Sequence, residues 1–267
     1  MEKIIHSDNS SADSADNILS HLKADTIDGV IHSLDRIIAW SKQHKKQTGY
    51  FAALYRKVTV RVRDGIQHGE FENGERMEKL DVIFANRYLE AFEAYCHQQP
   101  TTCVWQLAFE LGEKWSPIVL QHLMIGMNAH INLDLGIAAA QTVDHAELPS
   151  LKTDFDNINT LLASLVNEVQ DELAHIWPPF KWIDRFAGKT DEALADWGMK
   201  QARDQAWQFA LDYAAATDKQ QSLDCMDKKM YLLGLLLAKP SLRMRLILLG
   251  IRLAEHGGIP RKIEILE

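Results

Sequence analysis

Residues 117–142 are apolar on almost every side, which leaves the chain few ways to fold. Ser116 is suited to cap a helix here, and Pro117 suits the first helical position. The apolar residues that follow have no polar face between them: Ile118, Val119, Leu120, Leu123, Met124, Ile125, Met127, Ile131, Leu133, Leu135 and Ile137. Because a helix that is hydrophobic all round is buried all round, this stretch predicts the central helix of a bundle, at about 117–142.

The rest of the chain also has helical spacing of its apolar residues, and no stretch alternates as a half-buried strand would. Gly and Pro residues such as Gly69, Pro100 and Pro240 separate the helical stretches. The sequence therefore predicts one all-α domain, residues 17–267, with about eight to ten helices around the central one. The first 16 residues are rich in Ser, Asp and Asn and predict a disordered segment.

Composition restricts the partners that the chain can have. Its formal net charge of −8 argues against nucleic acid, which requires a clustered basic surface. The short basic stretches at 42–46, 56–63 and 243–252 are expected to be solvated helix faces. No run of 18 or more apolar residues occurs, so no membrane span is expected. Three cysteines without CxxC spacing and an N-terminus without an apolar signal core indicate a cytoplasmic protein.

Polar residues interrupt the central helix where burial should be greatest. These residues are His122, Asn128, His130, Asn132 and Asp134. Burying such a group without a partner costs about 1–3 kcal/mol, so the cluster predicts either a satisfied internal network or a polar cavity. His130 and Asp134 are four residues apart, about 6 Å along one helix face, and can share a hydrogen bond or a metal ion.

A metal ion is one interpretation of this pair. A divalent ion such as zinc, iron or manganese at His130 and Asp134 needs further ligands from other helices, because His122 lies about 12 Å away along the axis. Asp81 is one candidate for such a ligand. The other candidates form a Glu-x-x-His motif made by Glu168, Glu172 and His175. Di-iron bundles use two such motifs, and because the chain has one, we expect a solvated helix face there.

A second polar group, Asp81 to Tyr88, interrupts another predicted helix. Arg87 is expected either to form an ion pair with Asp81 or Asp134, or to clamp a carboxylate or phosphate of a substrate. The candidate catalytic residues are His130, Asp134, His122 and Asp81. The candidate substrate-binding residues are Arg87, Asn86, Tyr88, Asn128 and Asn132.

Two functional hypotheses follow. The first is an enzyme that acts on a small molecule in a cavity around His130 and Asp134, by acid–base chemistry or metal-assisted hydrolysis. The second is a non-catalytic binding or interaction protein whose buried polar network is structural. The sequence has no phosphate-binding loop, dinucleotide fingerprint, nucleophile elbow or His-Glu-x-x-His motif, which sets those enzyme classes aside.

Several long motifs resemble a known family. The segments 77–89 (MEKLDVIFANRYL) and 121–136 (QHLMIGMNAHINLDLG), with Trp105 between them, are similar to a mostly bacterial family catalogued only as a domain of unknown function. The resemblance runs from about Asp25 to Trp207. It implies no known activity, but it suggests that the Asn-Arg-Tyr and Asn-Ala-His-Ile-Asn-Leu-Asp segments belong to one unit.

Overall fold

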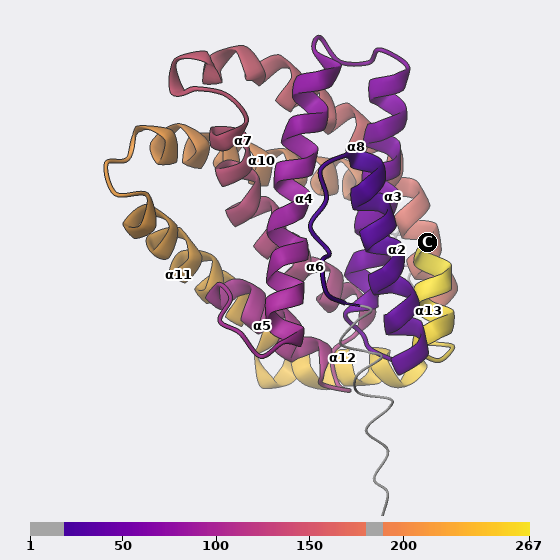
Figure 1. Ribbon diagram of the computed structural model, residues 1–267. Helices are drawn as coiled ribbons and strands as arrows, with labels where there is room; N and C mark the ends of the chain where they lie inside the picture. The colour runs from indigo at the N-terminus through magenta and orange to yellow at the C-terminus, as the bar shows by residue number, and fades with distance from the viewer. Residues whose placement is uncertain (1–18, 180–188) are drawn as a thin grey trace, which may run out of the picture.

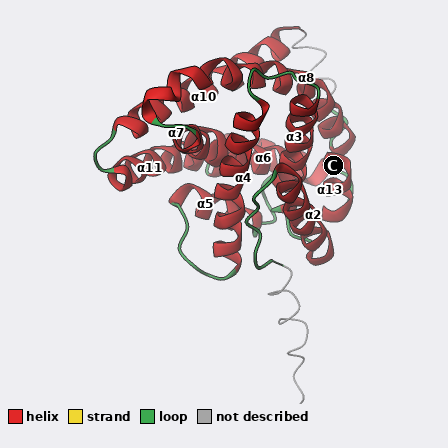
Figure 2. Ribbon diagram, turned by 45° about the horizontal axis from the view of Figure 1, so that its top comes forward, coloured by secondary structure: helices red, strands yellow, loops and turns green. Residues whose placement is uncertain are grey.

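The computed structural model describes residues 19–179 and 189–267, and every regular element in those ranges is helical (Figures 1 and 2). In chain order the elements are α2 (Ile27–His44), α3 (Gly49–Gln67), α4 (Gly74–Cys96), α5 (Cys103–Gly112), α6 (Val119–Ala129), the π-helix η1 (His130–Asp134), α7 (Leu135–Thr142), the 3-10 helix η2 (His145–Leu151), α8 (Lys152–Ile176), α10 (Lys189–Ala215), α11 (Lys219–Ala238), α12 (Leu242–Ala254) and α13 (Ile259–Leu266). The all-α prediction is confirmed. The predicted disorder of residues 1–16 lies outside the described residues.

The predicted central helix is the continuous element α6–η1–α7. It packs against α3, α4, α5, α10 and α11, which surround it (Figure 1). Most of its apolar residues are buried, and Ile125, Leu133 and Ile137 are fully inaccessible, but Met124 is exposed, so the helix is not buried on every side as the sequence predicts. The helix begins at Val119 rather than at Pro117, because the Gln121 side chain accepts a hydrogen bond from the Ile118 N–H and ends the preceding loop there.

The central helix changes its winding in the middle. Residues His130–Asp134 form a π-helical turn, in which the Leu135 N–H donates to the carbonyl of His130, five residues back. A π-turn rotates the side chains that follow it relative to a regular α-helix, and such turns occur frequently at functional sites. The sequence predicted an unbroken α-helix here, and the turn coincides with the polar residues that interrupt it.

Short polar residues start several of the surrounding helices. Thr26, Asn73 and Asp218 each accept a hydrogen bond from the backbone N–H three residues later, at the starts of α2, α4 and α11. Such caps satisfy N–H groups that have no partner inside the helix. They set the residues at which α2, α4 and α11 begin. Among the described residues, no helix has the length and apolar character needed to cross a membrane.

Candidate functional site

Asp134 is fully buried and is held by two side chains from different helices. Its Oδ1 accepts from Arg87 Nε at 2.7 Å, and its Oδ2 accepts from Trp105 Nε1 at 2.7 Å. Burial alone would raise the pKa of Asp134, but the Arg87 guanidinium, with the hydrogen bond from Trp105, holds it below its ordinary value. The predicted ion pair of Arg87 with a buried carboxylate is confirmed, with Asp134 as the partner.

His130 lies in an aromatic environment instead of a polar one. Its ring stacks on Phe84 at a centroid distance of 3.6 Å and meets the edge of Tyr55 at 4.3 Å. Its Nδ1 is 3.8 Å from Asp134 Oδ2, which is too long for a hydrogen bond. Neither ring nitrogen has a hydrogen-bond partner among the described residues. Burial lowers the pKa of His130, and the nearby carboxylate offsets this only in part, so the ring is neutral at neutral pH.

Asp81 is a second buried carboxylate in this part of the core. Its Oδ2 has no hydrogen-bond partner in the part of the chain that the structure describes. Burial, with a smaller contribution from Glu78, raises the pKa of Asp81 to about 7. Burial, followed by the charges of Asp81 and Asp134, raises the pKa of the Tyr55 phenol well above its ordinary value. The charges of Asp81 and Asp134 therefore both contribute to raising the pKa of Tyr55, which lies beside His130.

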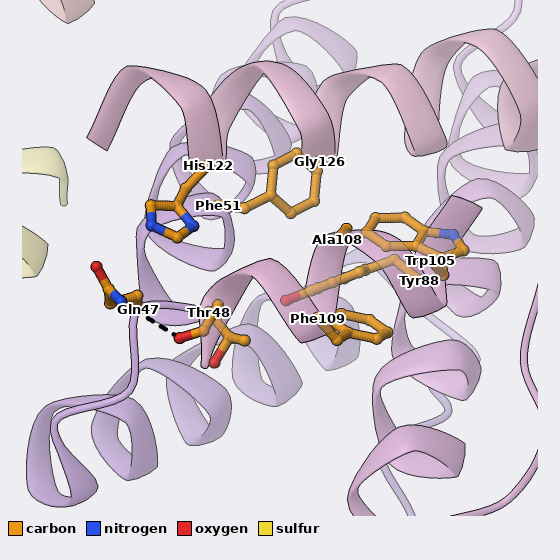
Figure 3. Close-up of a pocket in the computed structure, with 10 residues that line it drawn as sticks. Gln47, Thr48, Phe51, Tyr88, Trp105, Ala108, Phe109, His122 and Gly126 are labelled. Atoms are coloured by element: carbon orange, nitrogen blue, oxygen red, sulfur yellow. Dashed lines mark hydrogen bonds between the residues drawn. The ribbon is translucent and has the colours of Figure 1, made fainter. Parts of the chain in front are cut away.

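The cavity in this core lies next to His122, not next to His130 (Figure 3). Its volume is about 20 Å³, and it lies between Phe51 of α3, Tyr88 of α4, Trp105 of α5 and Gly126 of α6. A cavity of this volume accommodates about one water-sized group. The enzyme hypothesis from the sequence places the cavity around His130 and Asp134. Aromatic rings fill that position, which explains why the open space is displaced along α6.

Four of the residues that line the cavity each carry a buried polar atom that has no hydrogen-bond partner within residues 19–179 and 189–267. We refer to them as the four cavity atoms: Gln47 Oε1, Thr48 Oγ1, Tyr88 Oη and His122 Nε2. In Figure 3 the Tyr88 hydroxyl points into the space between Thr48 and His122. They come from the α2–α3 loop, α4 and α6, so three separate parts of the chain supply hydrogen-bonding groups to one cavity.

The electrostatic environment keeps His122 neutral. Burial, then the positive charges of Arg252 and Lys262, lower the pKa of His122 to about 3. Its ring meets the edge of Tyr50 at a centroid distance of 5.6 Å. A neutral imidazole can donate from one nitrogen and accept at the other. A histidine with so low a pKa is a weak base at neutral pH, so this ring is better suited to binding than to proton transfer.

The three asparagines predicted to bind substrate all form internal hydrogen bonds. Asn86 pairs with the backbone of Ala24 through both its oxygen and its nitrogen, at 2.8 and 2.7 Å. Asn128 donates to the Met230 carbonyl of α11 and accepts from Asn132, each at 3.0 Å. The structure therefore groups Asn128 and Asn132 into a link between α6, η1 and α11, and it places Asn86 against the chain before α2.

The residues proposed as metal ligands are engaged otherwise. Both oxygens of Asp134 accept hydrogen bonds, and Glu168 and Glu172 form ion pairs with Lys57. Among the side chains that the structure describes, no group of three or more His, Cys, Asp or Glu is arranged to hold a metal ion. The pair His130–Asp134 therefore does not gain the further ligands that the sequence interpretation needed.

Sequence reasoning missed three residues of this site. Gln47 and Thr48 are in the short α2–α3 loop, where their types predict only solvent exposure. Trp105 stood between the two family-like motifs, but its role as a hydrogen-bond donor to Asp134 was not foreseen. One signal was available, because a buried tryptophan N–H usually finds an acceptor.

The fold and the site define an all-α protein with a buried arginine–aspartate–tryptophan network at a π-turn and a small cavity beside His122. The chain matches a family of unknown function (DUF5995) over residues 27–240, and it belongs to that family. The comparisons with curated proteins and with solved structures each found no match.

Proposed function

We propose that this protein binds a small polar molecule in the cavity between α3, α4, α5 and α6. The observation that carries the proposal is that four residues around a space of about 20 Å³ each carry a buried polar atom without a partner among the described residues. Each buried polar group without a partner costs about 1–3 kcal/mol, which a purely structural core can avoid with apolar residues of similar shape. A ligand that hydrogen-bonds to these atoms offsets that cost.

The cavity restricts the size of the group that enters it. A volume of about 20 Å³ suits one hydroxyl- or amine-sized group, so we expect the ligand to insert a single polar group between Tyr88 and His122. The rings of Phe51, Trp105 and Phe109 line the remaining wall, so the cavity has no room for a larger body beside that group. Binding, without proton transfer, is the role that fits a His122 whose pKa is about 3.

A second candidate function is acid–base catalysis around Asp81, Tyr55 and His130. It is favoured by the pKa of Asp81, which at about 7 suits a group that exchanges a proton at neutral pH. This candidate requires the aromatic rings around His130 to move, because they fill the space where a substrate would bind.

The first proposal is tested with Tyr88→Phe, which removes one cavity atom and almost nothing else. Wild type and variant are compared by thermal unfolding in the presence of a library of small alcohols, amines and amides. We expect at least one compound to raise the Tm of the wild type and to lose its effect in the variant. A ligand at 100 times its Kd stabilises a protein by about 2.7 kcal/mol, which such a measurement resolves.

Tyr55→Phe is the matched control, because its hydroxyl is also buried without a partner among the described residues but does not line the cavity. We expect Tyr55→Phe to respond to the compounds as the wild type does. Equal responses of all three proteins to every compound would contradict binding in this cavity. A compound whose effect is lost in Tyr55→Phe but kept in Tyr88→Phe would favour the site around His130.

A further inference from the structure

The surface of α12 and the end of α11 exposes leucines that a folded chain usually buries. Leu242, Leu246 and Leu253 expose 72%, 64% and 69% of their surface, and Leu236 of α11 exposes 71%. Among the described residues, α12 has none that is buried. The helix runs along one end of the bundle, between α11 and α13 (Figure 1). Contiguous apolar patches of this kind mark sites of interaction.

The exposed leucines of α12 form one stripe. Leu242, Leu246, Leu249 and Leu253 follow one another at spacings of four, three and four residues, which places them on a single face of the helix. Arg245 lies along one edge of that face, with Arg252, whose side chain is buried in an ion pair with Glu255, and Arg243 lies toward the other edge. The result is an apolar stripe bordered by positive charge.

The segment 228–254, which includes most of α11 and all of α12, is positively charged, whereas the rest of the chain is negatively charged. Residues 228–254 contain no Asp or Glu, and their six basic residues are Lys228, Lys229, Lys239, Arg243, Arg245 and Arg252. With a net charge of −8 for the whole chain, the remainder carries −14. The sequence interpretation of 243–252 as a solvated helix face accounts for the arginines but not for the leucines between them.

An aromatic residue extends the same surface. Trp115 exposes 58% of its surface, and the guanidinium of Arg252 lies 5.5 Å from the centroid of its ring. The Arg252 Nε also donates to the Trp115 carbonyl at 2.7 Å, which fixes the end of α12 beside this ring. Tryptophan is enriched where a protein meets the interface between lipid and water.

We propose that α12, with the end of α11, docks the protein on an anionic lipid surface. The helix lies in the plane of the interface, with its leucine stripe toward the acyl chains and Arg243 and Arg245 among the anionic headgroups. Long arginine side chains reach the headgroups while their stems remain in apolar surroundings. The docking is peripheral, since α12 has 13 residues and a spanning helix needs about 20.

A second copy of the chain fits this surface less well. In a symmetric dimer the same patch faces itself, so Arg243 and Arg245 would lie near their own equivalents. No carboxylate between residues 228 and 254 is available to pair with them. An anionic lipid surface complements both the apolar stripe and its charge.

The test is co-sedimentation of the full chain with lipid vesicles. We expect binding to vesicles of equal parts phosphatidylcholine and phosphatidylglycerol, weaker binding at high salt, and none to phosphatidylcholine alone. Each basic residue near an anionic surface contributes about fivefold to the affinity, so Arg243→Glu with Arg245→Glu should weaken binding by about 25-fold or more. Leu242→Asn with Leu246→Asn should also weaken it, because the stripe no longer inserts.

The matched control is Lys79→Glu with Lys200→Glu, which makes the same change of charge on exposed residues of α4 and α10. It should bind as the wild type does, and circular dichroism should show that all variants are folded. Equal weakening in the control would overturn the proposal, as would failure of the wild type to bind anionic vesicles. A dimer in light scattering that the leucine variant dissociates would assign the surface to a second copy and overturn it as well.

Discussion

The centre of the bundle and the α11–α12 surface differ in opposite ways from the usual pattern of buried apolar and exposed polar residues. Around Asp134 the protein buries charged and polar groups, whereas α12 leaves leucines in contact with solvent. Both departures cost stability in the isolated chain. The central groups are held by hydrogen bonds from Arg87 and Trp105, and the leucines of α12 are not covered by any described part of the chain. The comparison indicates that the central network stabilises the fold and that α12 binds a partner outside the chain.

Of the substitutions considered, Asp134→Ala should lower the free energy of unfolding most. It leaves Arg87 Nε and Trp105 Nε1 without their acceptor, and breaking a buried pair in this way costs about 3–5 kcal/mol. Leu246→Ser on α12 should change the free energy of unfolding by no more than about 0.5 kcal/mol. Urea unfolding followed by circular dichroism measures both values. Equal losses would show that α12 belongs to the folded core.

Asp81→Asn should alter how stability depends on pH. The folded-state pKa of Asp81 is about 7, above its ordinary value, so the folded protein holds this proton more tightly than the unfolded chain. The stabilisation is therefore present at low pH and is lost as the pH rises through about 7. Asparagine resembles the protonated carboxyl, so the variant should be more stable than wild type by about 2–4 kcal/mol above pH 7, with the difference vanishing near pH 4.

Unfolding by urea at a series of pH values tests this expectation. Asp224→Asn, at an exposed position on α11, is the control and should stay within about 0.5 kcal/mol of wild type at every pH. A difference for Asp81→Asn that does not change between pH 4 and pH 8 would contradict the proton held at Asp81.

A pair of glycine substitutions gives the smallest expected effect and sharpens the comparison further. A Cβ at Gly136 of α7 would lie 2.7 Å from the backbone oxygen of Ala206, so Gly136→Ala should cost about 1–3 kcal/mol. At Gly250 of α12 a Cβ meets no described atom within 4 Å, and Gly250→Ala should stabilise the helix by up to about 1 kcal/mol. Differential scanning calorimetry reads both shifts. Destabilisation by Gly250→Ala would mean that α12 is closely packed against a partner in solution.

The sequence by itself determined the helical class and the central position of residues 117–142, and it offered the pairing of Arg87 with a buried carboxylate as one of two interpretations. The spacing of apolar residues can be read directly from the sequence, and a buried charge needs a partner wherever it lies. Both inferences can therefore be made without knowing which helices meet. The family membership was also recognisable, because its motifs are continuous stretches.

The tertiary structure alone decided the π-turn at His130, the use of Trp105 on Asp134 and the place of the cavity. Each depends on contacts between helices that are distant in sequence. The spacing of residues along one helix does not predict such contacts. Phe84 and Tyr55 occupy the space beside His130, so the open volume lies instead at His122, with Gln47 and Thr48 on its wall. Whether the leucines of 242–253 were core or surface was likewise settled by packing, because α12 crosses the end of the bundle instead of entering it.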